Sequence, residues 1–136
     1  MADTPAAIPG VLPHLTIRDG RAAEAIDFYK AAFGAEEVAR MPGESGKLMH
    51  ANLTINGGTL MLNDDFPEMM DGKETPPPAA VTLHIEVADA DAAWERALAA
   101  GAAVRFPLDN QFWGQRYGQL TDPFGHCWSI GGPVKE

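Results

Sequence analysis

The sequence is poor in cysteine and in basic residues, and it has no long apolar run. Cys127 is the only cysteine among 136 residues, so no disulfide can form within the chain and a reducing compartment is expected. Ten Lys and Arg residues stand against 19 Asp and Glu, which gives a formal net charge of −9. Nucleic acids and anionic membranes bind clustered cations, so neither is expected as a partner. No stretch of about 18 apolar residues is present, so no membrane span is expected.

The first residues also lack the pattern of a secretory signal. Residues 1–10 are rich in Ala and Pro and have no basic segment followed by an apolar one. Together with the single cysteine, this predicts a soluble cytoplasmic protein. The chain does have 46% hydrophobic residues, enough to build the core of one domain over residues 1–136.

The first half of the chain predicts one strand, one helix and three further strands. Apolar residues alternate over 11–17, as in a strand, and recur at helical spacing over 21–33. The three further strands fall at 37–41, 48–55 and 59–63. Asn56-Gly57 lies between the last two and is a strong hairpin signal. Asp19 is placed to cap the helix.

The second half repeats this order. The acidic, Pro-rich stretch before it reads as a connecting loop. A strand at 81–87 and a helix capped by Asp89 then follow, and the last strands fall at 104–106 and on either side of 122–125. The helix-ending glycines, Gly34 and Gly101, are 67 positions apart, which indicates an internal repeat. The repeat divides the domain into a module at 11–63, a linker at 64–80 and a module at 81–132.

These elements predict an α+β fold of two tandem βαβββ modules. A unit of about 60 residues has too little core to be stable alone, so the two modules are expected to pair. The curled mixed sheets would surround a central cavity, with the helices outside.

Alternation along the strands separates an apolar face, which would pack on the helices, from a polar face. The polar face holds His, Thr, Asn and Met with one carboxylate, whereas a solvated face usually carries Lys, Arg and Glu. A solvated face is the alternative, but neighbouring aromatic residues favour a ligand cavity. The expected cavity residues are His14, Thr16, His50, Asn52, Met61, Thr82, His84, Glu86, Phe112, Trp113, Arg116, Tyr117 and Ser129.

Two of the histidines and the carboxylate are the candidate catalytic groups. His14 and His84 could bind a metal, hydrogen-bond a ligand or transfer a proton. Glu86 could act as a general base, or it could form an ion pair with Arg18 or Arg116, and the ion pair is favoured. His50 is expected to be structural or exposed to solvent.

Several motifs resemble those of the vicinal-oxygen-chelate superfamily, which includes glyoxalase I, extradiol dioxygenases and bleomycin- and fosfomycin-resistance proteins. The resemblance is strongest to its PhnB-like branch and covers the chain from residue 11 onward. The motifs lie at 14–17, 25–29, 33–36, 61–64, 83–87, 111–118 and 122–130. The resemblance implies paired βαβββ modules, a small-molecule cavity between them, and a homodimer.

The resemblance also implies a degraded metal site. Metal-dependent members take one ligand from each of four strands, typically two His and two Glu. Those positions hold His14, Met61, Thr82 and Ser129 here, with His84 one inward step beyond Thr82. At most two good ligands, His14 and His84, are in place where a firm site needs three. The sequence therefore favours no cofactor and leaves a divalent metal ion as the alternative.

Two classes of function follow from this resemblance. The first is a metal-free protein that binds or sequesters a small molecule, as the bleomycin-resistance relatives do. The second is a metal-dependent lyase, isomerase, dioxygenase or thiol transferase acting on a small oxygen-rich substrate. A pure scaffold is a third class, disfavoured by the polar face. The ubiquinone-pathway methyltransferase label of some PhnB-like relatives is discounted, because no Gly-rich strand-to-helix turn for a nucleotide-like cofactor is present.

Overall fold

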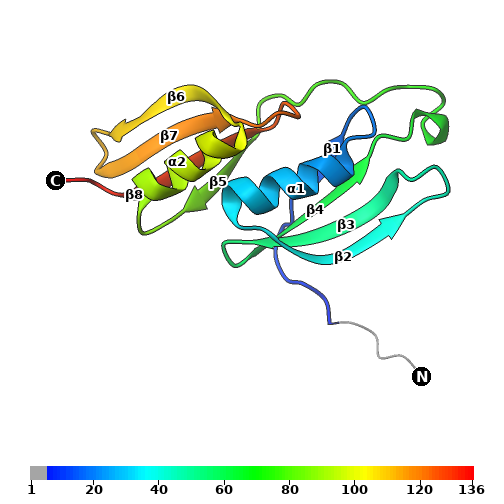
Figure 1. Ribbon diagram of the computed structural model, residues 1–136, viewed down its shortest axis with the longest axis horizontal. Coiled ribbons are helices and arrows are strands. Elements are labelled where there is room, and N and C mark those ends of the chain that lie inside the picture. Colours follow the sequence, from blue (N-terminus) through cyan, green and yellow to red (C-terminus); the bar gives the residue numbers. More distant parts are fainter. Residues whose placement is uncertain (1–5) are drawn as a thin grey trace.

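The computed structural model describes residues 6–136 as two helices and two four-stranded sheets (Figure 1). Residues 1–5, half of the predicted lead-in, lie outside the described part. The first module consists of β1 His14–Ile17, α1 Ala22–Phe33, β2 Glu36–Pro42, β3 Leu48–Ile55 and β4 Gly58–Asp64. The second consists of β5 Thr82–Glu86, α2 Ala90–Ala100, β6 Ala103–Asn110, β7 Gln115–Thr121 and β8 Cys127–Pro133. Over residues 6–136, neither helix has the length and apolar character needed to cross a membrane.

Both modules have the same topology, which confirms the tandem βαβββ prediction. The strand orders are β1-β4-β3-β2 and β5-β8-β7-β6, with a parallel first pair and antiparallel pairs elsewhere. The predicted hairpin is present: Asn56 and Gly57 have φ of 50° and 80°, as a tight two-residue turn requires. The segment between the modules contains one short 3-10 helix, η1 Pro67–Met69.

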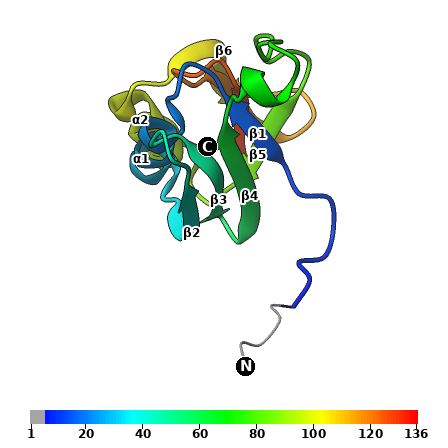
Figure 2. The same ribbon diagram turned by 90° about the vertical axis from the view of Figure 1, so that its right-hand side faces the viewer.

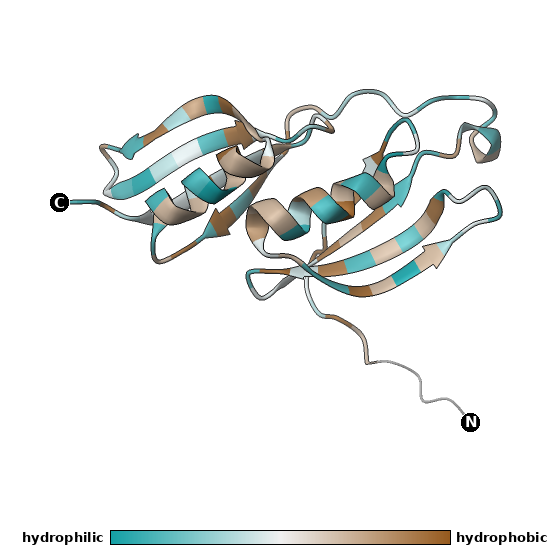
Figure 3. Ribbon diagram, in the orientation of Figure 1, coloured by the Kyte–Doolittle hydropathy of each residue, from teal (hydrophilic) through white to brown (hydrophobic). Residues whose placement is uncertain are grey.

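The two helices lie together on one side of the strands (Figure 2). The apolar face of each sheet packs on its helix, and the hydropathy bands that alternate along β3 show the two faces (Figure 3). The opposite, polar faces are not covered by any helix among the described residues. The sheets form two separate units and do not close on each other.

The start of α1 is held by a residue far away in the sequence. The predicted cap, Asp19, makes no hydrogen bond to the helix, because it lies in a turn with Gly20 in which both residues have positive φ. Buried Asp64 takes its place: Oδ1 accepts from the backbone N–H of Ala22 (2.8 Å), and Oδ2 accepts from that of Leu48 (2.7 Å). The α2 prediction is confirmed, since Asp89 accepts from the third residue of its helix.

One buried carboxylate joins the modules. Asp122 Oδ2 accepts from the Tyr29 hydroxyl of α1 (2.7 Å) and from Trp128 Nε1 of β8 (2.9 Å). Its Oδ1 accepts from the backbone N–H groups of Phe124 and His126. All four acceptor sites of this 4%-exposed residue are therefore used.

Burial raises the pKa of Tyr29 well above its ordinary 10.0, and the charge of Asp122 adds to the effect. Because the folded-state pKa exceeds the unfolded one, this contribution to stability is complete below about pH 10 and is lost as the pH rises above it. We expect the free energy of unfolding to fall above pH 10 by up to about 1.4 kcal/mol per pH unit from this group. Urea unfolding at pH 8 to 11 of wild type and Tyr29→Phe measures it. Equal declines in both proteins would contradict the assignment.

Candidate ligand-binding face

The polar face of each sheet carries part of the predicted site. The first module holds His14, Thr16, His50, Asn52 and Met61 on β1, β3 and β4. The second holds Thr82, His84, Glu86, Tyr117 and Ser129 on β5, β7 and β8, with Trp113 in the β6–β7 turn. Over residues 6–136, no hydrogen bond or aromatic contact joins the two groups. Each face must therefore be considered separately.

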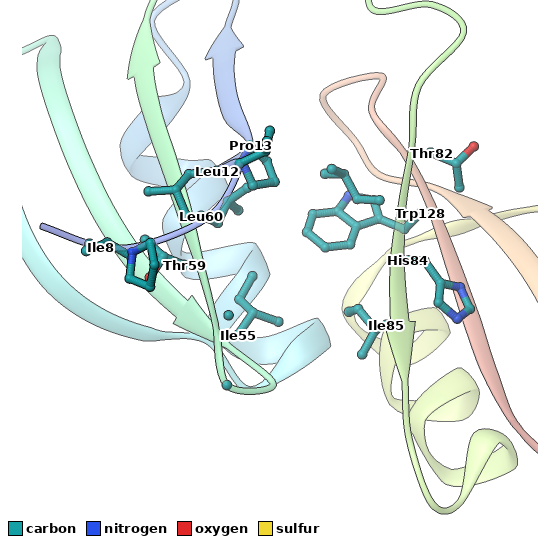
Figure 4. A pocket seen from close by; sticks show the side chains of 15 residues that line it. Ile8, Leu12, Pro13, Ile55, Thr59, Leu60, Thr82, His84, Ile85 and Trp128 are labelled. Carbon is teal, nitrogen blue, oxygen red and sulfur yellow. The ribbon is translucent and has the colours of Figure 1, made fainter.

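The hollow between the modules is mostly apolar. It has a volume of about 640 Å³, and Leu12 and Leu60 line one side while Ile85 and Trp128 line the other. Thr59, Thr82 and His84 also line it, and Figure 4 shows the side chain of His84 on the side of β5 away from Leu12 and Leu60. Within one chain, the space between the modules is therefore bounded mostly by residues of the apolar faces.

Strand pairing in the second module differs from that in the first by two residues. In the first module His14 lies opposite Met61. A constant offset of 68 residues would place Thr82 opposite Ser129, but Ser129 instead lies opposite His84. The histidine is thus the direct neighbour of the serine across the strands.

His84 and Ser129 are part of a hydrogen-bonded cluster on the second face. His84 Nε2 lies 2.8 Å from Glu86 Oε1, and His84 Nδ1 lies 2.7 Å from Ser129 Oγ. Gln115 Nε2 donates to the same Glu86 oxygen at 2.7 Å. A carboxylate only accepts, so Nε2 of a neutral His84 carries the proton and Nδ1 accepts from the serine hydroxyl. Ser129 is buried (1% exposed), and therefore orients the imidazole rather than facing a ligand.

Aromatic side chains surround the exposed part of the cluster. The Tyr117 ring stacks on His84 with centroids 5.9 Å apart and an interplanar angle of 22°. Trp113 and Phe106 each contact Tyr117, at centroid distances of 5.6 and 6.4 Å. Both outer rings are about half exposed. The arrangement combines fixed polar groups with open aromatic surface, which is typical of small-molecule sites.

Two residues of this cluster were not predicted from the sequence. A Cβ at Gly131 would lie 2.7 Å from Glu86 Oε1 and 2.8 Å from His84 Cε1, so only glycine leaves room for the cluster. Gln115 lies two positions before Tyr117 on β7 and therefore on the same face. That alternation could have identified Gln115. The glycine carried only the weak signal of a Gly-Gly pair inside a strand.

The same alternation places Arg116 on the opposite face of the second-module sheet from Gln115 and Tyr117. Its guanidinium forms a bidentate ion pair with Asp91 of α2, with N–O distances of 2.8 and 2.9 Å. Arg116 therefore lies on the helix side, and the expected ion pair with Glu86 is wrong, since Glu86 binds His84 and Gln115 instead. Phe112, at the turn between β6 and β7, contacts Trp113 edge to face with centroids 5.2 Å apart and is itself 97% exposed.

The first-module face holds a smaller polar cluster. The His14 and His50 rings meet edge to face with centroids 5.7 Å apart. His50 Nε2 lies 2.7 Å from Asn52 Oδ1, which orients this ring, and Met61 lies opposite both His14 and Asn52. His50 is thus part of a network rather than simply exposed.

The donor set of one chain does not fit the metal site of the metal-dependent relatives. No group of three or more His, Cys, Asp or Glu side chains converges within residues 6–136. The faces offer two pairs, His14 with His50 and His84 with Glu86. Met61 and Ser129, which the resemblance places at the two carboxylate positions, are not good ligands for a hard or borderline divalent ion.

Comparison with known families shows where the chain belongs. The model of the Glyoxalase/Bleomycin resistance protein/Dioxygenase superfamily matches residues 11–130. The chain is a member of this superfamily. An uncharacterized protein of Mycobacterium bovis is 54% identical over 132 residues, covering 94% of this chain and 86% of the relative.

Two solved structures share the fold. Protein PA1353 from Pseudomonas aeruginosa is 25% identical and superimposes with a TM-score of 0.76, covering 94% of this chain and all of that one. The PhnB protein from Bacillus cereus is 24% identical with a TM-score of 0.69, covering 93% of this chain and all of that one. The second likeness shows the fold alone, and it agrees with the resemblance to the PhnB-like branch.

Proposed function

We propose that this glyoxalase-superfamily member binds a small molecule on the polar face of its second module. The observation that carries the proposal is the His84–Glu86–Gln115 cluster, whose carboxylate side chain is 60% exposed beside half-exposed aromatic rings. A merely solvated sheet face has no need of a buried serine that orients an imidazole, or of a glycine that leaves room for it. Binding, with or without proton transfer by Glu86, is the function this geometry supports.

We infer that the binding unit is a homodimer. The polar faces remain open in a single chain, and edge strand β2 is exposed along its whole length. Covering the second-module face with the first-module face of a second copy would bring the His14–His50 pair to the His84–Glu86 pair. The metal-dependent alternative needs this arrangement, because one chain supplies only pairs of ligands.

Thermal-shift screening of a fragment library tests the proposal, with EDTA-treated wild type, His84→Gln and the control Glu95→Gln. Glu95 lies on the exposed side of α2 and has no part in the cluster. At about 100 times its dissociation constant, a ligand stabilises the folded state by about 3 kcal/mol, which raises Tm by several degrees. We expect such shifts in wild type and Glu95→Gln and their loss in His84→Gln.

Two results would contradict this proposal. One is a screen in which no compound stabilises the wild type. The other is a set of stabilising compounds that act equally on His84→Gln. Sedimentation of the same samples checks the dimer, for which a mass of twice 14.5 kDa is expected.

A further inference from the structure

Two series of hydrogen bonds in the second-module cluster end on one carboxylate. The Ser129 hydroxyl donates to His84, and His84 donates through Nε2 to Glu86. Trp113 Nε1 donates to Gln115 Oε1 at 3.0 Å, and Gln115 donates through Nε2 to Glu86. Glu86 Oε1 thus receives two hydrogen bonds. At this carboxylate, the cluster therefore offers a ligand an acceptor.

The other oxygen of this carboxylate is available. Glu86 Oε2 has no hydrogen-bond partner within residues 6–136, and in that part of the chain no Lys or Arg side chain bonds to Glu86. The two donors on Oε1 hold the carboxylate in place, so its orientation is set before a ligand arrives. The chain as a whole carries a net charge of −9, which opposes an anionic ligand.

The aromatic rings of this face favour the same ligand charge. Tyr117 stacks over His84, the residue that donates to Glu86, and Trp113 meets Tyr117 edge to face at 5.6 Å. Ring faces attract cations, most strongly those of Trp and Tyr. A carboxylate and aromatic rings on one sheet face, linked through His84 and Gln115, therefore match a positively charged nitrogen attached to a flat apolar group.

We propose that this face selects organic cations that carry at least one N–H donor and an aromatic ring. The inference rests on the proposed ligand-binding function and names its ligand class. Glu86 Oε2 accepts the N–H of the charged nitrogen, Trp113 and Tyr117 pack on the ring, and Gly131 keeps the space in which the carboxylate is held.

Three probes with the same ring separate charge from hydrogen bonding. Tryptamine has an ammonium group with N–H donors, N,N,N-trimethyltryptammonium has the charge without donors on that nitrogen, and indole-3-propionate is an anion. We expect calorimetric titration of the full-length protein to show tryptamine binding about tenfold more tightly than the trimethyl compound. Indole-3-propionate should bind more weakly than both.

Variants test whether the Glu86 carboxylate is responsible for the preference for tryptamine. Glu86→Gln keeps the size of an exposed side chain and should reduce the tryptamine affinity about tenfold, bringing it near that of the trimethyl compound. Glu95→Gln removes the same charge elsewhere and should leave all three affinities unchanged. Gly131→Ala removes no charge but displaces the carboxylate, and should reduce the preference as Glu86→Gln does. If that variant is destabilised, Gln115→Leu removes one of the two donors to Oε1 instead.

The outcomes distinguish a failure of this inference from a failure of the proposed ligand-binding function. Equal binding of the cation and the anion, or equal loss in Glu86→Gln and Glu95→Gln, would overturn the cation selectivity while leaving a ligand site in place. No tryptamine binding in a protein that the fragment screen shows to bind other compounds would overturn it as well. A screen without any hit contradicts the function itself.

Discussion

Asp122→Ala is expected to lower the free energy of unfolding by about 3–5 kcal/mol, a large part of the stability of a domain this size. The substitution removes the acceptor of four hydrogen bonds at once. It leaves the Tyr29 hydroxyl, the Trp128 indole N–H and two backbone N–H groups without partners in a buried place. Each buried donor that loses its acceptor costs about 1–3 kcal/mol, and relaxation recovers part of the sum.

Denaturant unfolding of Asp122→Ala beside Tyr29→Phe measures this effect. Tyr29→Phe removes one donor and leaves Asp122 with three, so its expected loss is about 1–2 kcal/mol. Equal losses in the two variants would show that the phenol contact carries the whole effect. A loss below that of Tyr29→Phe would contradict the role of Asp122 as the residue that joins the modules.

Asp64→Ala is expected to cost about 2–4 kcal/mol. Its two oxygens separately hold the first N–H of α1 and the first N–H of β3, and the residue is only 1% exposed. The matched control is Asp89→Ala, which removes the exposed cap of α2 and should cost about 1 kcal/mol. Thermal and urea unfolding of both variants gives the comparison. Similar losses would mean that Asp64 acts only as a helix cap.

Local patterns in the sequence predicted the fold well. The Asn56-Gly57 hairpin, the Asp89 cap and the apolar alternation of β3 each depend on residues close together in the chain. The cap of α1 could not be found in this way, because Asp64 is 42 positions from the N–H that it binds. Asp19 is nearer to α1 in the sequence and has a suitable side chain, but its positive φ places it in a turn from which it makes no hydrogen bond to the helix.

The site was predicted only in part, for a similar reason. Alternation placed His84, Glu86 and Ser129 on one face, yet it does not say which residue of one strand lies opposite which residue of the next. The pairing of His84 with Ser129 depends on that register. Applied strictly, alternation would also have separated Arg116 from Tyr117 and added Gln115.

The two-residue difference in strand pairing has a consequence for how the repeat diverged. Two residues are one full period of a strand, so sliding by two keeps every side chain on its own face and changes only its neighbours. The difference of two residues therefore leaves a first-strand histidine, His14 or His84, beside the corresponding residue of the last strand, Met61 or Ser129, in both modules. The modules differ in the chemistry of that last-strand residue, because a serine hydroxyl can donate to an imidazole and a thioether cannot. The repeat thus diverged at the last-strand position, while the histidine kept its place on the polar face.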